Sequence, residues 1–471
     1  MSTPSTPSMD SIVELIKSTS TFEQLHKEVQ QLRKLDKASN DNHTSIFESA
    51  LQDGRDPLEV LDSLQHSAGY LFILNARLSV EGCDLDRMLP LLLEFSEKFD
   101  YEQLALVPDQ VSYLVKTITN FVQSSPSHQA TIALLLPLRL MVMRSSRPGH
   151  LTVLHPGFLD LCIKSRAYDF ALDLLLTDTI DVDNTLGQVK YIDHLQYHYL
   201  GGVILALLKY KERAIDFLEI AVSAPGHSVS LVQIDAYKKL VILQLLTHGK
   251  TSPLPKYTAP NVHGAIKSRC AAYLDFATAF MKLDKSALMN LVAQHGPAFE
   301  EDLNSGLVKR CLASLRRRQI EKLTETYMTL SLGDLCQALG LDRNVEHDLL
   351  DVKQELSMMI DEKHIFGSIT PADDLASATV TFTDDSSLYT SHETLQRLAQ
   401  SIATTQKMIA QSDARAKEIE KSKEFVTKAY TAAGNQASAM AGGHGMNLAS
   451  MPSFGGEFDY AEEGVWDGGD D

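Results

Sequence analysis

The chain has 471 residues, of which 44% are hydrophobic, and its 43 Lys and Arg against 61 Asp and Glu give a net charge of −18. That length exceeds what one hydrophobic core supports, so several domains or a repeat array are expected. The negative charge opposes binding to nucleic-acid phosphates and to anionic membranes, because both need a basic face.

The five cysteines are scattered along the chain, and none is paired at Cys-x-x-Cys spacing. This pattern is typical of unpaired thiols in a reducing compartment. The most apolar stretch, 130–143, is too short to cross a bilayer and contains Pro137 and Arg139. Residues 1–10 are rich in Ser, Thr and Pro and are expected to be disordered, not a signal peptide. These features predict a protein of the cell interior without a membrane partner.

Residues 11–195 are predicted to form a helical-repeat region. Apolar side chains recur at helical spacing from Ser11 to Leu35. The same spacing continues in further segments, which are separated by Gly54, Pro57, Gly82 and Pro108: 58–64, 70–78, 86–99 and 110–121. Because alternating β-branched runs are few, the pattern favours a mainly α chain that begins with an α-solenoid.

Residues 198–225 carry the clearest repeat unit. Its small–small–large–small spacing matches a tetratricopeptide (TPR) repeat at Gly202, Ala214, Leu218 and Ala221. Gly202 and Ala214 would let two antiparallel helices approach closely, and Leu218 would fill the groove between them. Ala221 would leave room for the next helix, so TPR-like packing is predicted at these four positions.

Residues 196–389 are predicted to form a second region, a helical subdomain (196–330) followed by a winged helix (331–385). The subdomain contains a Pro-rich connector at 251–260. Three predicted helices follow it, at 262–281, 285–293 and 306–330. In the winged helix, Ser331 is expected to cap a short helix that stops at Gly340. A longer helix is expected from Asn344 to about Lys363.

Two short segments of the winged helix, 366–370 and 378–382, have the composition of strands. A small sheet leaves edge strands that a neighbouring chain can extend. The segment 378–382 is predicted to be such an edge, with Val380 and Phe382 at an interface. An internal strand covered by its own wing is the alternative.

A long helix is predicted over 390–433, beginning with a capping box at Thr390 and Glu393. Its apolar seam follows a heptad spacing through Leu395, Leu398, Ile402, Ile409, Ile419 and Val426. The seam is diluted by Thr405, Ser412 and Lys423, which suits a mixed helical bundle with partner subunits. A homodimeric coiled coil is the alternative.

The last segment, 434–471, is rich in Gly and acidic residues, contains no Lys or Arg, and is predicted to be disordered. Its aromatic residues, which include Trp466, leave two interpretations open. The segment is either a partner-binding linear motif or a solvated tail.

The sequence offers no catalytic motif. His194 and His198 have the spacing of a zinc-protease helix, but Leu195 stands where the general base Glu would be. The chain also contains no H-x-H pair, no P-loop and no G-x-S-x-G motif. We therefore expect no enzyme activity, no cofactor, no metal and no small-molecule substrate.

A winged helix also raises the hypothesis of a nucleic-acid adaptor, whose second helix would enter the major groove. Here the second helix carries an excess of acidic residues, so its surface would repel phosphate. The basic cluster Arg316–Arg318 lies on the preceding helix. A solvated face or contact with an acidic surface is the preferred interpretation of this cluster.

Helical repeats running into a winged helix resemble the PCI-domain family, which includes subunits of the COP9 signalosome, the proteasome lid and a translation initiation factor. The stretches that carry the resemblance lie within roughly residues 150–385 and are 199–225, 237–258, 306–336 and 358–369. Within this family the chain is most similar to signalosome subunits, with the proteasome lid as the alternative.

The resemblance implies a non-catalytic scaffold in an assembly that removes NEDD8 from cullin-RING ubiquitin ligases. In that family the isopeptidase is a different subunit, the PCI subunits join through their winged helices, and their C-terminal helices meet in a bundle. The implied partners are other PCI and MPN subunits and, indirectly, cullin-RING ligases. The implied localisation is cytoplasmic and nuclear.

Overall fold

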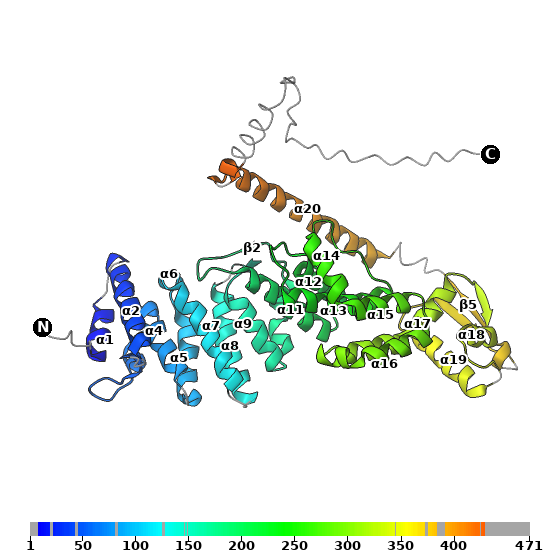
Figure 1. Cartoon of the computed structure of the whole chain (residues 1–471), viewed down its shortest axis with the longest axis horizontal. Coiled ribbons are helices and arrows are strands. Elements are labelled where there is room, and N and C mark those ends of the chain that lie inside the picture. The colour runs from blue at the N-terminus through cyan, green and yellow to red at the C-terminus, as the bar shows by residue number, and fades with distance from the viewer. Residues whose placement is uncertain are drawn as a thin grey trace, which may run out of the picture. The chain divides into compact units, whose positions relative to one another are not determined.

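The computed structural model confirms the mainly α fold class, in which a row of helices is followed by a winged helix with a small sheet (Figure 1). It describes residues 8–428 apart from gaps at 19–21, 43–45, 81–82, 125–127, 146, 148, 344, 373–374, 384–390 and 424. The chain divides into two compact units. The larger comprises residues 1–365 and 369–381, and the smaller comprises 366–368 and 382–471.

The first helices of the larger unit follow one another in a row (Figure 1), and their bounds are α1 (Met9–Lys17), α2 (Phe22–Asn42), α3 (Pro57–Val60), α4 (Ser67–Ser79), α5 (Leu85–Lys98), α6 (Tyr101–Ala105), α7 (Pro108–Ser124), α8 (His128–Ser145), α9 (Leu154–Lys164) and α10 (Leu172–Leu176). The helical spacing from Ser11 to Leu35 belongs to two helices, because Ser18 ends α1. The predicted disordered N-terminus is too long by two residues, since Ser8 caps a helix that already contains Met9 and Asp10.

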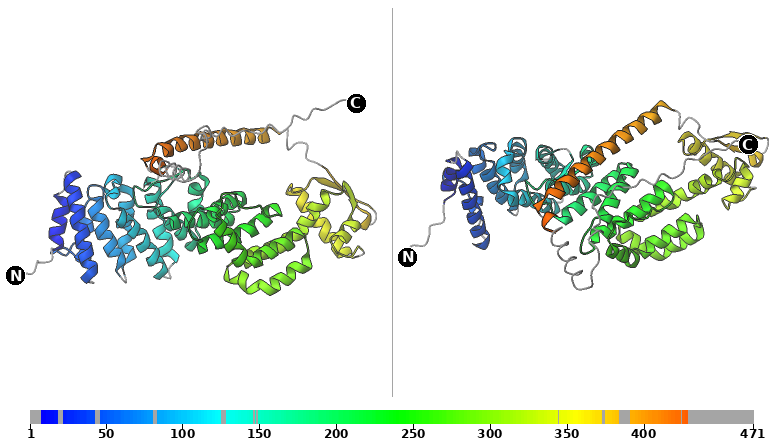
Figure 2. Two further views of the ribbon diagram at one scale, coloured as in Figure 1. Left: turned by 45° about the horizontal axis from the view of Figure 1, so that its top comes forward. Right: turned by 90° about the horizontal axis from the view of Figure 1, so that it is seen from above.

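The next helices continue the row as α11 (Tyr191–Leu207), α12 (Lys211–Ser223), α13 (Leu231–His248), α14 (Pro260–Arg269), α15 (Ala271–Met281), α16 (Lys285–Glu301) and α17 (Ser305–Thr324) (Figure 2). A domain boundary at 195/196 is wrong, because it falls inside α11, which packs against α9 and α12. The buried core runs without interruption from Met9 to Leu315. The repeats and the helical subdomain are therefore one continuous array.

Many of these helices end in the same way, with a residue in the left-handed conformation. Lys209 after α11 (φ 69°), Leu283 after α15 (φ 59°) and Leu303 after α16 (φ 57°) are examples. In each case the next residue donates its backbone N–H to a carbonyl five positions earlier, as Tyr210 does to Leu205. This Schellman arrangement satisfies the carbonyls that a helix end leaves free. It also turns the chain back towards the next helix.

A polar network fixes the turn between α16 and α17. Asp302 accepts hydrogen bonds from Lys238 Nζ (2.5 Å) on α13 and from Tyr273 Oη (2.8 Å) on α15. Asn304, which is 1% exposed, donates to Tyr273 Oη (2.9 Å) and accepts from Lys239 Nζ (2.7 Å). Because the polar groups satisfy one another, the network ties α13 and α15 to the turn between α16 and α17.

The winged helix consists of β3 (Thr329–Ser331), α18 (Leu332–Ala338), α19 (Glu346–Asp361), β4 (Gly367–Thr370) and β5 (Thr379–Phe382). Ser331 caps α18 through its side chain, and Gly340 follows the helix with φ 74°, which confirms both predicted signals. The strand β3 was not predicted, because residues 329–330 were assigned to the preceding helix. A boundary at 330/331 is therefore wrong, since it cuts this strand.

The smaller unit contains α20 (His392–Lys421), which is the long helix (Figure 1). Its N-cap is Ser391, whose side chain accepts the backbone N–H of Thr394 at 3.1 Å. The predicted capping box began at Thr390, which lies outside the described residues. The predicted helix of about forty residues is too long, because Ser422 takes an extended conformation and ends α20. Residues 429–471, including the predicted disordered tail 434–471, lie outside the described residues.

Candidate protein-interaction surfaces

The apolar seam of α20 is open to solvent, and no residue of this helix is buried. The predicted seam residues are all exposed, at 54% for Leu395, 56% for Leu398, 50% for Ile402, 53% for Ile409, 53% for Ile419 and 39% for Val426. Val426 follows the break at Ser422, so it does not continue the same helix. Met408 and Phe425 are also exposed, although the heptad pattern did not include them.

The sheet of the winged helix has the strand order β3-β5-β4. The prediction that residues 378–382 form an edge strand is therefore wrong, since β5 is the central strand. Thr329 pairs with Thr381 and Leu330 with Val380 in an antiparallel register. Val380 is fully buried and Phe382 is 7% exposed, so both belong to the core of the winged helix. Its edges are β3 and β4.

The TPR-like unit of α11 and α12 shows the close approach that its spacing predicts. A Cβ added at Gly202 would lie 2.8 Å from Leu218 Cγ and 3.3 Å from the carbonyl oxygen of Ala214. A Cβ at the neighbouring Gly201 would lie 2.8 Å from the ring of Phe217. Leu218 and Ala221, which both belong to α12, are buried, and α12 packs against α11 and α13. These residues are packing residues and do not form a surface.

The side chains of the basic cluster Arg316–Arg318 form ion pairs and hydrogen bonds with other groups of the same chain. Arg316 and Arg317 lie 3.3 and 3.8 Å from the carboxylate of Glu355 on α19, and Arg317 also pairs with Glu362 at 2.7 Å. Arg318 donates to the carbonyl oxygens of Leu246 (2.8 Å) and Thr247 (2.7 Å) at the end of α13. The acidic surface that Arg316 and Arg317 contact is therefore the winged helix of the same molecule.

The histidine pair of α11 does not form an open site, because His198 is buried in the core and His194 is half-buried. The rings of His194 and His198 are 4.5 Å apart, and His198 is 4% exposed against Phe217. Burial lowers the pKa of His198 to about 3, so its imidazole is neutral at physiological pH. Within the described part of the chain, no three His, Cys, Asp or Glu side chains are grouped to hold a metal ion.

All five cysteines are free thiols. Burial raises the pKa of the Cys162 and Cys311 thiols to about 12, which keeps them protonated and unreactive. Among the helices of the described residues, none has the length and apolar character needed to cross a membrane.

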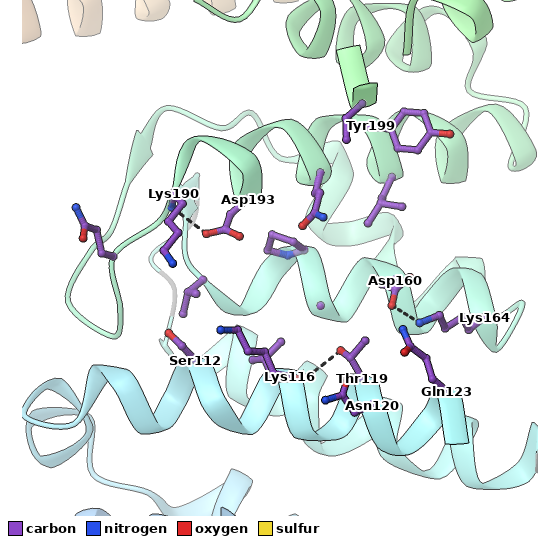
Figure 3. Close-up of a pocket in the computed structure, with 18 residues that line it drawn as sticks. Ser112, Lys116, Thr119, Asn120, Gln123, Asp160, Lys164, Lys190, Asp193 and Tyr199 are labelled. Atoms are coloured by element: carbon purple, nitrogen blue, oxygen red, sulfur yellow. Dashed lines mark hydrogen bonds and ion pairs between the residues drawn. The ribbon is translucent and has the colours of Figure 1, made fainter. Parts of the chain in front are cut away.

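A groove with both polar and apolar lining residues lies between α7, α9 and α11 in the larger unit (Figure 3). It has a volume of about 530 Å³. α7 forms one wall with Lys116 and Asn120, and the other wall carries Lys190 and Asp193. The helices approach closely at its floor, where a Cβ on Gly157 would lie 2.3 Å from Val115 Cγ1. Sequence reasoning missed this groove because its residues come from four separate helices.

Two comparisons with known proteins identify the family. The family model "COP9 signalosome complex subunit 3, N-terminal helical repeats" matches residues 21–262, and the model "PCI domain" matches residues 292–376. The chain belongs to the COP9 signalosome subunit 3 family. The protein named COP9 signalosome complex subunit 3 of Dictyostelium discoideum is 31% identical over 328 residues, which cover 69% of this chain and 77% of that protein.

The protein of the same name from Arabidopsis thaliana is 29% identical over 344 residues, which cover 72% of this chain and 76% of that protein. The family resemblance is thus confirmed. It also extends further than expected, because the repeat model begins at residue 21 whereas the sequence resemblance began near residue 150. The first helices, which looked merely helical, belong to the same family unit.

Proposed function

We propose that this chain is a non-catalytic scaffold subunit of a COP9 signalosome, where it supports the removal of NEDD8 from cullin-RING ligases by another subunit. The family membership supports this assembly, since both relatives carry its name. The proposed partners are other PCI and MPN subunits, and cullin-RING ligases through them. The proposed localisation is cytoplasmic and nuclear.

The observation that carries the proposal is the exposed seam of α20. Leu395, Leu398, Ile402 and Ile409 are each at least half exposed on one helix. Burial of such an apolar stripe against other helices is favourable at about 25 cal/mol per Å² of buried apolar surface. The polar seam residues Thr405 and Ser412 weaken a two-stranded coil of identical helices and suit a bundle of unlike helices.

A matched pair of double variants tests this contact. Leu398→Asp with Ile402→Asp places two charges in the seam, and burying an unpaired charge costs about 3 kcal/mol or more. This variant should lose co-elution with its partner subunits on native size-exclusion chromatography. Gln400→Asp with Thr404→Asp adds the same charges at the same spacing on the opposite face, and it should co-elute normally. Normal assembly of the seam variant would defeat the proposal.

Affinity purification from cells followed by mass spectrometry tests the identity of the assembly. Cullins and signalosome subunits are expected, whereas proteasome ATPases would instead assign the chain to the proteasome lid. Fluorescence titration at low salt tests the adaptor hypothesis, and no binding to duplex DNA is expected. Cleavage of a NEDD8–cullin conjugate by the purified chain alone would overturn the scaffold function.

A further inference from the structure

Residues of α8, α9, α10 and α11 line a cavity of about 290 Å³ in the larger unit, separate from the groove of α7, α9 and α11. Two of its lining residues, His155 of α9 and Tyr197 of α11, are each only 2% exposed. Their rings meet edge to face, with centroids 5.7 Å apart. Polar groups that are buried in a protein normally have a hydrogen-bond partner. The partners that these two side chains lack therefore indicate what the cavity can bind.

His155 supplies one free donor. Its Nδ1 accepts the backbone N–H of Thr152 at 3.0 Å, and the Thr152 hydroxyl lies 2.8 Å from the same nitrogen. Burial lowers the pKa of His155 to about 4, so the imidazole is neutral at physiological pH. Because Nδ1 is an acceptor, the single ring proton is on Nε2. Among the described residues, none accepts a hydrogen bond from Nε2.

Tyr197 supplies a second free donor. Its Oη accepts the hydroxyl proton of Thr179 at 3.3 Å, and Thr179 also lines the cavity. Burial raises the pKa of the Tyr197 phenol, so the hydroxyl keeps its own proton at physiological pH. No group in the described part of the chain accepts that proton. Two buried donors without an acceptor point to a ligand that carries acceptor oxygens.

The charge around the cavity selects the kind of acceptor. Arg147 lines the cavity, is exposed, and forms no ion pair with the residues that the structure describes. The acidic lining residue Asp173 is paired with Arg139 at 3.3 Å. A further carboxylate, that of Asp183, interacts electrostatically with the lining residue His150. One cation is thus left for a ligand, and the nearby acidic groups disfavour a second negative charge, so a carboxylate fits better than a phosphate.

We propose that this cavity binds a carboxylate on a short apolar stem. The carboxylate oxygens accept the protons of His155 Nε2 and Tyr197 Oη, and the negative charge pairs with Arg147. Met143 and Leu174, which also line the cavity, provide apolar contacts that a stem uses and water does not. The stem belongs to a free acid or to a glutamate side chain of another protein, since both present the same group. Binding here is additional to the proposed scaffold function, which needs no ligand.

Methionine methyl signals in nuclear magnetic resonance report on this site in the full-length chain, because Met143 lines the cavity and is 47% exposed. In isotopically labelled protein, butyrate should shift the Met143 signal saturably with a Kd on the order of 1 mM. Met143→Leu identifies that signal. Butyramide has the same shape without the charge and should bind at least about tenfold more weakly. Equal binding of butyramide would overturn the carboxylate assignment, and the absence of a shift with butyrate would overturn the site.

Two variants test the proposed contacts. Arg147→Gln and Tyr197→Phe should each raise the Kd for butyrate about tenfold, because each removes an interaction with a charged group. Arg147 is exposed, so its variant remains informative even if circular dichroism shows that Tyr197→Phe impairs folding. Arg269→Gln removes the same charge from an exposed position on α14 and should bind butyrate like the wild type. An unchanged Kd in Arg147→Gln would contradict the proposal, as would an equal loss in Arg269→Gln.

Inorganic phosphate and a blocked glutamate distinguish the remaining ligands. Phosphate should bind about tenfold more weakly than butyrate, because its second charge meets the nearby acidic groups and it has no apolar stem. Tighter binding of phosphate would overturn the carboxylate assignment. N-acetylglutamate α-amide carries the same carboxylate between two peptide groups. If it binds more tightly than butyrate, the source is a protein side chain, and if butyrate binds more tightly, the source is a free acid.

Discussion

Two regions of this protein carry the same helical pattern of apolar residues but use it differently. In the repeat unit of α11 and α12, Leu218 is 1% exposed and lies against Gly202. In α20, Leu398 is 56% exposed, and the helix has no buried residue. The apolar face of the repeat is therefore satisfied within the chain, whereas that of α20 is available to another helix.

The difference shows which sequence feature distinguishes an internal contact from an external one. Periodicity alone predicts a helix with one apolar face in both regions. Only the repeat has glycines where its helices cross, and Gly201 and Gly202 let Phe217 and Leu218 approach their backbone. The seam of α20 contains no glycine and has polar residues at Thr405 and Ser412. In this chain, the helix pair that packs internally has glycines at its crossing, and the exposed seam of α20 has none.

The largest expected effect comes from making the same substitution in both regions. Leu218→Ala should lower the free energy of unfolding by about 2–5 kcal/mol, because it leaves a cavity in a packed core. Leu398→Ala should change it by less than about 0.5 kcal/mol in the purified chain, because the side chain is exposed. Urea denaturation followed by circular dichroism measures both. Equal losses would show that α20 also packs within the molecule.

A second prediction concerns pH and the buried histidine of the repeat. Burial lowers the pKa of His198 from 6.5 to about 3, so the folded chain stays unprotonated where the unfolded chain takes up a proton. The stability from this group is complete above pH 6.5 and is lost as the pH falls towards 3. At pH 5 the loss is about 2 kcal/mol. His198→Leu should remove this part of the pH dependence.

Urea denaturation of the wild type and His198→Leu at pH 7, 6 and 5 checks this prediction. The free energy of unfolding of the variant should rise relative to that of the wild type as the pH falls. The substitution removes no hydrogen bond of Nδ1, because that atom has no partner in the described structure. Parallel curves would contradict a neutral buried His198 and would indicate that the repeat opens to water at this position.

The sequence predicted best where local chemistry decides the structure. Ser331 and Gly340 mark the ends of α18 as expected, because a cap and a positive φ depend on one residue each. The breaks at Ser18 and Cys270 were missed, since the apolar spacing continues across them. Strand order was missed as well. It depends on the pairing of β5 with residues 329–331, which are about fifty residues away in the chain.

The interaction surfaces also divide into features set by local sequence, which could be predicted, and features set by long-range packing, which could not. The α20 seam could be predicted because all its residues lie on one helix, although its N-cap and its end at Ser422 were not. The role of Arg316 and Arg317 could not be predicted, because it depends on their distances of 3.3 and 3.8 Å from the carboxylate of Glu355 on α19. The groove could not be predicted either, since it is assembled from distant helices. Long-range packing therefore accounts for most of what sequence patterns missed.

A third prediction compares two arginines, one between helices and one on α20. Arg318→Met should cost about 1–2 kcal/mol, because the carbonyl oxygens of Leu246 and Thr247 lose a charged donor. Arg397→Met removes only an exposed pair with Glu393 four residues earlier, which contributes about 0.3–0.5 kcal/mol. Thermal unfolding measures both. A larger effect of Arg397→Met would show that the exposed surface of α20 contributes more to stability than its ion pair indicates.

The smallest expected effects come from glycine substitutions, which should raise stability in the repeat and lower helix stability in α20. Lys209 ends α11 with φ 69°, a conformation that favours glycine, so Lys209→Gly should stabilise the chain by about 0.5 kcal/mol. Lys407 lies in the middle of α20, where Lys407→Gly should reduce helix stability by about 1 kcal/mol. The midpoint of urea unfolding tests the first variant, and amide hydrogen exchange within α20 tests the second. If Lys209→Gly destabilised the chain, the turn between α11 and α12 would not hold the left-handed conformation. The close approach of Gly202 and Leu218 would then need another cause than the tight connection of their helices.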